Sequence, residues 1–372
     1  MYFRVNIMRN DIPRVLFICK KRPAIYGASY GLLNSCRFLC NALHDMGVEA
    51  KTVEVVDNNG IDHEVHHYKP THVFIEALWV VPEKFDTLIK LHPRVQWNVR
   101  LHSNIPFIAN EGTAMDWIKK YIDLQKKYAQ FNIAPNAQLM VNDLYHTFGV
   151  HTVYAPNIYQ PSINEEEFAN YIPPDKHPRT IEIGCFGAIR PLKNQLIQAM
   201  AAIAFARELK QTLHFHINYT RIETNGDNVY KNIQSLFDGT KHKLIIHNWL
   251  THHEFMKLIC RMELGLQVSF SETFNIVSAD FVHLNVPLVG SKQIEWLSGK
   301  YQADPNDLEN IVSHLRVAWL GREDNLQNLN KKGLNSWNKA ARKVWKNYMN
   351  YPSLKERVSR RNSDVPATHF EE

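Results

Sequence analysis

The sequence predicts an α/β protein built from two doubly wound, parallel-sheet domains that face a cleft. The chain has 372 residues, and a prior of roughly one domain per 150 residues gives two domains. Short apolar runs alternate with helical patterns in two successive series, which is typical of parallel sheets. A segment with four prolines, residues 161–179, separates the two series and is the best linker in the sequence.

Residues 1–160 contain the first series. Its clearest strand is the apolar run 14–19, which is bounded by charged residues and is typical of a parallel strand buried on both faces. A loop with two glycines follows, and Gly47 ends the next helical pattern. We expect further strands at 51–56, 71–77, 94–101 and 152–154, and helices at 32–46, 113–130 and 141–148.

Residues 180–330 contain the second series, which begins with a strand at 180–186. Two helices near 306–319 and 323–348 close the chain. Residues 331–372 are expected to pack back towards the first domain and to end in a basic tail. The remaining strands are expected at 213–218, 244–248, 264–268 and 287–290, and the helices between them at 194–209, 229–237, 252–260 and 275–284.

The composition is that of a soluble globular protein, with 45% hydrophobic and 22% charged residues. The net charge of +6 suits an anionic ligand or polymer, although a slight excess of lysine and arginine is ordinary for a soluble protein. The five cysteines are odd in number and form no C-x-x-C pair, which favours reduced thiols and a cytoplasmic location. No apolar run reaches the ~18 residues that span a bilayer, so we expect membrane contact to be peripheral at most.

The first motif with chemical content is the segment 271–280, which follows an apolar strand and opens a helix. Free backbone N–H groups at a helix N-terminus attract phosphate or sugar oxygens. Glu272 stands at the strand–helix turn, and Asp280 follows slightly over two helical turns later on the same side of the helix. Two carboxylates at this separation suit the hydroxyls of a sugar and of a ribose. A helix-start charge and a solvated residue are the plainer alternative.

The second motif is the loop 187–194, which lies between a strand and a helix. It opens with Gly187 and contains Arg190 and Lys193. A planar guanidinium and an ammonium point charge can together hold a diphosphate. A surface loop that carries two cations is the alternative.

The two motifs resemble those of the retaining GT-B glycosyltransferases, in particular glycosyltransferase family 4. The donor domain of that family carries a G-R-L-x-x-x-K-N-like turn and then an E-x7-E motif within E-G-F-G-x-x-x-x-E-A-x-x-x-G-x-P-V-V. This sequence keeps Gly187, Lys193 and Asn194 of the family's G-R-L-x-x-x-K-N-like turn, and its residues 272–291 match the E-x7-E segment without a gap. Residues 247–251 and 156–157 resemble the family's nucleobase-side loop and P-N turn, so the resemblance covers about residues 150–320. Over the first 150 residues it is only topological.

This resemblance implies an acceptor-side Rossmann-like domain, a donor domain and transfer of a sugar from a nucleoside diphosphate with retention. Lys193, with Arg190, would bind the diphosphate, Glu272 would hydrogen-bond the sugar, and Asp280 would bind the ribose. No cofactor and no metal are implied besides the nucleotide-sugar donor. The further donor-binding residues implied are Gly187, Asn248, Trp249, Leu250, Thr273, Phe274, Asn275 and Ile276.

Three departures from the family pattern concern the donor site. The first-turn arginine of the family falls at Ala188, and Arg190 is the candidate to replace it. The two glycines of E-G-F-G are Thr273 and Asn275, which allow less close approach of the backbone to a ligand. The second glutamate is Asp280, which is shorter by one methylene. These changes bear on the identity of the donor more than on the reaction.

Three residues of the first domain are candidates for the catalytic or acceptor side of the cleft. Gly27 lies in the loop after the first strand, where the family has its acceptor-side glycine loop. Arg100 and His102 end a strand, which places His102 in the cleft. In the family, a histidine at such a position often touches the donor sugar or the acceptor, whereas a polar strand-end residue is the plainer interpretation.

Other classes of site have little support. The adjacent histidines His66 and His67, and likewise His252 and His253, have side chains that point apart, so a metal site is not expected. No P-loop and no G-x-G-x-x-G occurs, which makes an ATPase or a dehydrogenase a weak interpretation.

The acceptor stays open at this stage. A saccharide or a lipid-linked glycan is common in the family, and DNA with hydroxylated bases is the alternative, because similar phage GT-B enzymes act on such bases. Residues 331–361 hold ten Lys/Arg and one acidic residue, with aromatic residues interleaved, and could grip phosphates. A solvated helix, or one that approaches an anionic membrane, explains the same pattern. The second alternative is a catalytically silent module that binds sugar nucleotides.

Overall fold

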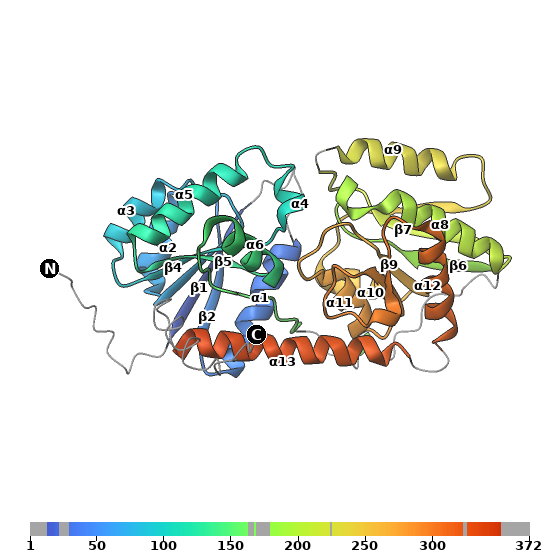
Figure 1. The fold of residues 1–372 in the computed structure, drawn as a ribbon. Helices are drawn as coiled ribbons and strands as arrows, with labels where there is room; N and C mark the ends of the chain where they lie inside the picture. The colour runs from blue at the N-terminus through green and yellow to red at the C-terminus, as the bar shows by residue number, and fades with distance from the viewer. Residues whose placement is uncertain are drawn as a thin grey trace, which may run out of the picture.

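The computed structural model of the chain describes residues 13–21, 30–162, 167–168, 179–223, 225–322 and 326–350. Two lobes lie side by side, and each contains one parallel sheet with helices packed around it (Figure 1). This is the two-domain α/β class that the alternating pattern predicts. The long C-terminal helix α13 runs along both lobes (Figure 1).

The first lobe contains a five-stranded sheet in the order β2-β1-β3-β4-β5, and every neighbouring pair is parallel. Its central strand β3 is buried at every position, as expected for a sheet covered by helices on both faces. The strands are β1 (Arg14–Lys20), β2 (Glu49–Val55), β3 (His72–Glu76), β4 (Gln96–Leu101) and β5 (Phe131–Pro135), and the helices are α1 (Tyr30–Asp45), α2 (Gly60–Tyr68), α3 (Lys84–Leu91), α4 (Ile105–Ile108), α5 (Ala114–Lys127) and α6 (Gln138–Phe148).

The prediction of a strand at 152–154 is wrong. Val153 in that segment and Ala155 after it each donate one backbone hydrogen bond to β5, which is the actual edge strand. Strand β5 contains the buried Asn132 and ends in Pro135, and both residue types are depleted in strands. Helices α2 and α3 were not expected either, because eight or nine residues are too few to show a clear helical period.

The second lobe contains a six-stranded parallel sheet in the order β11-β10-β9-β6-β7-β8. Counted from β6, this is the 3-2-1-4-5-6 order of dinucleotide-binding sheets, in which the order reverses between β6 and β9. The strands are β6 (Thr180–Gly184), β7 (Thr212–Asn218), β8 (Lys243–His247), β9 (Leu264–Gln267), β10 (Leu288–Ser291) and β11 (Gln302–Ala303), and the helices are η2 (Pro191–Lys193), α8 (Gln195–Glu208), α9 (Gly226–Phe237), α10 (His252–Ile259), α11 (Ile276–His283), η3 (Gly299–Tyr301), α12 (Leu308–Leu320) and α13 (Asn328–Asn350).

Helix α13 contributes side chains to the cores of both lobes. Leu334, near its start, is buried in the core of the second lobe, whereas Ala341 and Trp345 are buried in the first lobe against β1 and α1. Trp337, between them, packs against both cores. One helix therefore joins the two sheets into one packed unit.

The chain leaves the first lobe through the buried segment 155–159, and α13 holds this segment with side-chain hydrogen bonds. The indole N–H groups of Trp345 and Trp337 each lie 2.8 Å from a carbonyl oxygen, that of Pro156 and of Asn157 respectively. Asn338 bonds both the N–H and the carbonyl of Tyr159 at 2.9 Å. Over the described part of the chain, no helix combines the length and the apolar character needed to cross a bilayer.

Candidate functional site

Two of the residues predicted for the donor site lie at the strand-order reversal of the second sheet. Lys193 follows β6, and Glu272 follows β9, and these two strands are neighbours. In open parallel sheets, ligands bind beyond the carboxyl ends of the strands at this reversal. The tertiary structure therefore places both residues where a ligand is expected.

Lys193 and Glu272 form an ion pair, with Nζ of the lysine 2.5 Å from Oε1 of the glutamate. Their side chains are only 12% and 8% exposed. Asn194, in the left-handed conformation at φ 58°, fixes the turn by donating from its amide to the carbonyls of Val268 and Pro305. The sequence predicted both charges but not that they would pair.

Gly187 lies beside the Lys193 side chain. Its φ of +123° is a conformation that residues with a side chain rarely adopt, and its N–H donates to Oδ1 of Asn218 at 3.1 Å. A Cβ at this position would lie 3.7 Å from Cε of Lys193. Gly187, which opens the loop 187–194, thus lets the backbone turn close to the lysine side chain.

Arg190, the second predicted cation, lies at the boundary of the lobes and is already paired. Its guanidinium is 2.7 Å from the carboxylate of Glu223, which also binds Arg221, and it stacks 4.6 Å from the ring centre of Phe107 on α4. Burial acts to raise the pKa of Glu223, but the two guanidiniums outweigh it and lower that pKa. A diphosphate at Arg190 would have to compete with this carboxylate.

Residues 273–276 form the turn into α11. Phe274 is buried against Trp296 and Trp337, so its ring serves as packing, while Ile276 begins the helix. Asn275 adopts φ 61° and caps α11 by accepting from the N–H of Ser278 at 2.9 Å. Asn275 therefore adopts a left-handed backbone that glycine adopts more readily, and it adds a helix cap.

Asp280 is buried rather than solvated. Its Oδ1 accepts from the Tyr159 hydroxyl at 2.8 Å and lies 2.8 Å from Nε2 of His252. Burial acts to lower the pKa of His252, but the charge and hydrogen bond of Asp280 outweigh it and raise that pKa. The sequence analysis identified neither partner of Asp280. Tyr159 lies in the segment 155–159, 121 residues before Asp280, and His252 begins α10.

The loop after β8 presents an apolar wall. Trp249 and Leu250 are half-buried, and Asn248 is exposed. The backbone N–H of Trp249 donates to the Thr220 hydroxyl at 2.9 Å, and the Arg221 guanidinium lies 5.8 Å from the centre of the indole ring. This loop has the surface character that a nucleobase would need.

On the first lobe, His102 is held by two partners. Its Nε2 lies 2.5 Å from Oε2 of Glu76, and its Nδ1 faces the Asn136 amide at 3.3 Å. This arrangement assigns the ring proton to Nε2, since the amide of Asn136 donates to Nδ1. Burial lowers the pKa of His102 despite the nearby Glu76 carboxylate, so the ring is neutral at neutral pH.

Arg100, a candidate for the acceptor side, has no exposed surface through which it could touch an acceptor. The side chain is fully buried; it pairs with Glu76 at 3.2 Å and donates to Ala155 O and to Asn157 Oδ1. Burial acts to raise the pKa of Glu76, but Arg100 and His102 together lower it. Arg100 therefore links Glu76, at the end of β3, to Ala155 and Asn157. Gly27, the other acceptor-side prediction, lies outside the described residues.

The two lobes contact each other at residues 272–273, just before α11. Asn104 donates from its amide to the backbone carbonyl of Glu272 at 2.8 Å, and Asn136 donates to the Thr273 hydroxyl at 3.1 Å. The side-chain carbonyl oxygens of both asparagines are buried and lack a hydrogen-bond partner among the described residues. The sequence analysis identified neither Asn104 nor Asn136. Each residue follows a strand of the first sheet, and this position at a strand end is the signal that could have identified them.

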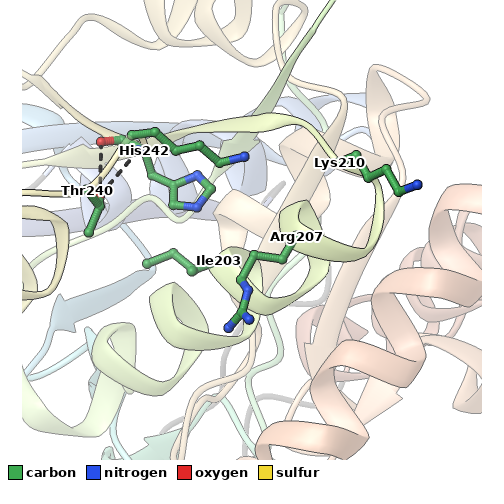
Figure 2. A pocket seen from close by; sticks show the side chains of 6 residues that line it. Ile203, Arg207, Lys210, Thr240 and His242 are labelled. Atoms are coloured by element: carbon green, nitrogen blue, oxygen red, sulfur yellow. Dashed lines mark hydrogen bonds between the residues drawn. The ribbon is translucent and has the colours of Figure 1, made fainter.

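A separate hollow of about 540 Å³ lies between α8 and the turn before β8 (Figure 2). It is at the amino ends of the strands, opposite the edge where Lys193 and Glu272 lie, so it is not the donor site. Its lining residues are Ile203, Arg207, Lys210, Thr240, Lys241 and His242. No cluster of three or more His, Cys, Asp or Glu suited to a metal occurs in the described part of the chain.

No family model and no curated protein matches the sequence. Solved structures do match. A UDP-forming α,α-trehalose-phosphate synthase from Burkholderia vietnamiensis is 11% identical with a TM-score of 0.61, and the match covers 96% of this chain and 99% of that one. A trehalose-6-phosphate protein from E. coli, bound with UDP-2-fluoro glucose, is 11% identical with a TM-score of 0.60 over 91% and 99% of the two chains.

A third solved structure is S. aureus TarM in complex with Fondaparinux, α-GlcNAc-glycerol and UDP. It is 12% identical with a TM-score of 0.53, and the match covers 75% of this chain and 55% of that one. At such identities the similarity shows the fold, while the narrower resemblance to family 4 stays a prediction. The chain has the two-domain GT-B fold of the retaining glycosyltransferases among its structural neighbours.

Proposed function

We propose that this protein is a glycosyltransferase that moves a sugar from a nucleoside diphosphate to an acceptor hydroxyl with retention. The observation that carries the proposal is the Lys193–Glu272 pair. A cation and a carboxylate meet at the strand-order reversal of the second sheet, and the first lobe contacts the same turn through Asn104. A diphosphate requires a cation and sugar hydroxyls require an acceptor, and this pair supplies both.

Each part of the donor has a candidate partner in this proposal. Lys193 exchanges Glu272 for the diphosphate, and the freed carboxylate binds the sugar hydroxyls. Asp280 is the candidate for the ribose, which would have to displace Tyr159 or His252 from this buried carboxylate. Trp249, which is half-exposed, is the candidate wall for the base. The buried amide oxygens of Asn104 and Asn136 are further acceptors for sugar hydroxyls.

In the proposed reaction, the bond between the anomeric carbon and the diphosphate oxygen breaks, and the acceptor oxygen bonds to that carbon on the same face. The acceptor proton passes to the departing phosphate oxygen. Lys193, Arg190 and the N–H groups at the start of α11 stabilise the negative charge that develops there, and losing one such donor typically costs ~3 kcal/mol in barrier. His102, held neutral by its burial, faces the sugar rather than serving as a charged group.

We favour a saccharide acceptor and a uridine nucleotide donor as the first pair to assay. The basis is the similarity in fold to a UDP-forming trehalose-phosphate synthase and to TarM, whose structure contains UDP and the saccharide Fondaparinux. DNA stays the alternative acceptor class, and the same assay can include it.

The test compares wild type with Lys193→Ala in a thermal-shift screen of nucleotide sugars. Binding at a hundredfold excess over Kd stabilises a protein by ~2.7 kcal/mol, which gives a measurable rise in Tm. We expect a rise for wild type and for the exposed-lysine control Lys210→Ala, and none for Lys193→Ala. Release of the nucleoside diphosphate by wild type then separates an enzyme from a silent module. If no donor shifts the wild type, or if Lys193→Ala transfers sugar normally, the site assignment is wrong.

A further inference from the structure

The exposed face of α13 carries a charge pattern that the proposed sugar transfer does not use. The helix has 23 residues, of which six are Lys or Arg and none is Asp or Glu. Helix α13 extends along both lobes, as Figure 1 shows. The surface it presents therefore lies across the joint between the domains.

Four lysines form one straight row on this face. Lys332, Lys339, Lys343 and Lys346 are all exposed. At about 100° per residue, their spacings of seven, four and three residues place them within an arc of about 60°. At 1.5 Å per residue, the row is about 21 Å long. We call these four residues the lysine row.

The opposite face of α13 fixes the orientation of the lysine row. Leu334, Ala341, Trp345 and Met349 are buried in the cores of the lobes, so the helix cannot rotate without unpacking both. The positions among the lysines are polar, since Asn335, Ser336 and Asn347 are exposed there. The row is thus a rigid, polar and cationic surface.

Among the described residues, no ion pair neutralises the lysine row. The adjacent Arg342 differs, because its guanidinium pairs with Asp45 on α1 at 3.4 Å. Placing four like charges on one arc costs self-repulsion unless an anionic partner relieves it. An anionic partner that extends over about 21 Å would match the lysine row.

We propose that the lysine row binds the phosphate backbone of duplex nucleic acid. Lysine, asparagine and serine side chains are the groups that contact phosphate and sugar oxygens in such complexes. A duplex has a persistence length of about 50 nm, so it stays straight along the row and offers about one phosphate charge per 1.7 Å of axis. A membrane fits less well, because helices that lie in a bilayer surface insert apolar side chains, and those of α13 are buried in the protein.

The test measures binding of the full chain to a labelled duplex DNA of about 20 base pairs by fluorescence anisotropy, over a series of salt concentrations. The variant replaces all four residues of the lysine row with Gln. We expect at least a tenfold loss of affinity at low salt, and a slope of log K against log salt that is shallower by about 3.6, since each phosphate contact contributes about 0.9. The matched control, which replaces Lys90, Lys119, Lys231 and Lys300 with Gln, removes the same charge from other exposed positions and is expected to bind as wild type does.

Three outcomes would overturn the proposal. Equal losses in variant and control would assign binding to net charge alone. If wild type shows no salt-dependent binding to the duplex, duplex nucleic acid is not the partner of the lysine row. Row-dependent binding to vesicles that contain an anionic phospholipid, without binding to the duplex, would assign the row to a membrane surface. Thermal unfolding and the nucleotide-sugar shift, measured on the same samples, report the fold and the donor site separately, so the sugar-transfer proposal stands or falls independently.

Discussion

At the scale of single residues, the candidate site consists of charges that already neutralise one another. Lys193 is paired with Glu272, Arg190 with Glu223, and the buried Arg100 with Glu76. Leaving one partner of such a pair buried without the other is costly, so each carboxylate keeps its cation in place until an anionic ligand replaces it. In the proposed reaction, a donor diphosphate would bring that replacement charge to Lys193 and Arg190, which would make their two pairs part of the binding equilibrium.

His247, at the end of β8, gives a prediction on pH. Burial, with smaller contributions from His216 and Arg261, lowers the pKa of His247 from 6.5 to about 4. Between these values the unfolded chain binds the extra proton and the folded chain does not. The free energy of unfolding is therefore unaffected by His247 above about pH 6.5, and His247 lowers it as pH falls towards 4. We expect urea unfolding to show a lower free energy of unfolding near pH 5 than near pH 7.

The matching variant His247→Gln removes the titrating group, so it should lose less stability than wild type over the same pH interval. The control is His66→Gln, which changes an exposed histidine on α2 and should leave the wild-type dependence intact. An unchanged pH dependence in His247→Gln would show that another group causes the loss. The window ends near pH 4.5, because the carboxyl groups begin to titrate below it.

At the scale of elements, the start of α11 depends on the unusual residue Asn275. It combines a left-handed backbone with a side-chain cap on Ser278, and its amide donates to Gln267 at 2.9 Å. Losing such a cap costs ~1 kcal/mol, and placing a Cβ in the left-handed region costs roughly another 1–2 kcal/mol. Both penalties bear on the turn that holds Glu272.

We therefore expect Asn275→Ala to be less stable than Asn275→Gly by about 1 kcal/mol, since glycine tolerates φ 61° at no steric cost. Both variants lose the cap and the Gln267 contact, so their difference isolates the backbone conformation. Urea unfolding of the two proteins measures it. An alanine variant as stable as the glycine variant would mean that the turn changes conformation on substitution.

At the scale of the whole molecule, α13 packs into the cores of both lobes. Trp337 packs against both cores, its ring contacts Phe274, and its indole N–H bonds Asn157 O. We expect wild type to unfold in one calorimetric transition. Trp337→Ala should lose on the order of 2 kcal/mol and unfold in two transitions, because the shared side chain is removed.

Differential scanning calorimetry tests this coupling, and Trp117→Ala is the control. Trp117 packs only against the core of the first lobe, so its loss should destabilise the protein without dividing the transition in the same way. A single transition in Trp337→Ala would show that other contacts, such as Asn338 with Tyr159, are sufficient to couple the lobes.

The sequence by itself determined the alternation of strands and helices, and with it the position of Lys193 and Glu272 at strand ends. This was possible because periodicity reports which face of an element is buried, and the carboxyl ends of parallel strands share one edge. It failed for β5 and for the short helices α2 and α3, where the apolar pattern is too brief or is interrupted by Asn132.

Only the tertiary structure decided which side chains meet at the site. Asn104 reaches Glu272 across 168 residues of sequence, Asn136 reaches Thr273 across 137, and Tyr159 reaches Asp280 across 121. A local pattern carries no information about a partner in another domain, because that choice depends on how the two lobes pack. The same packing buries one face of α13 in both cores and leaves its lysine row as a surface.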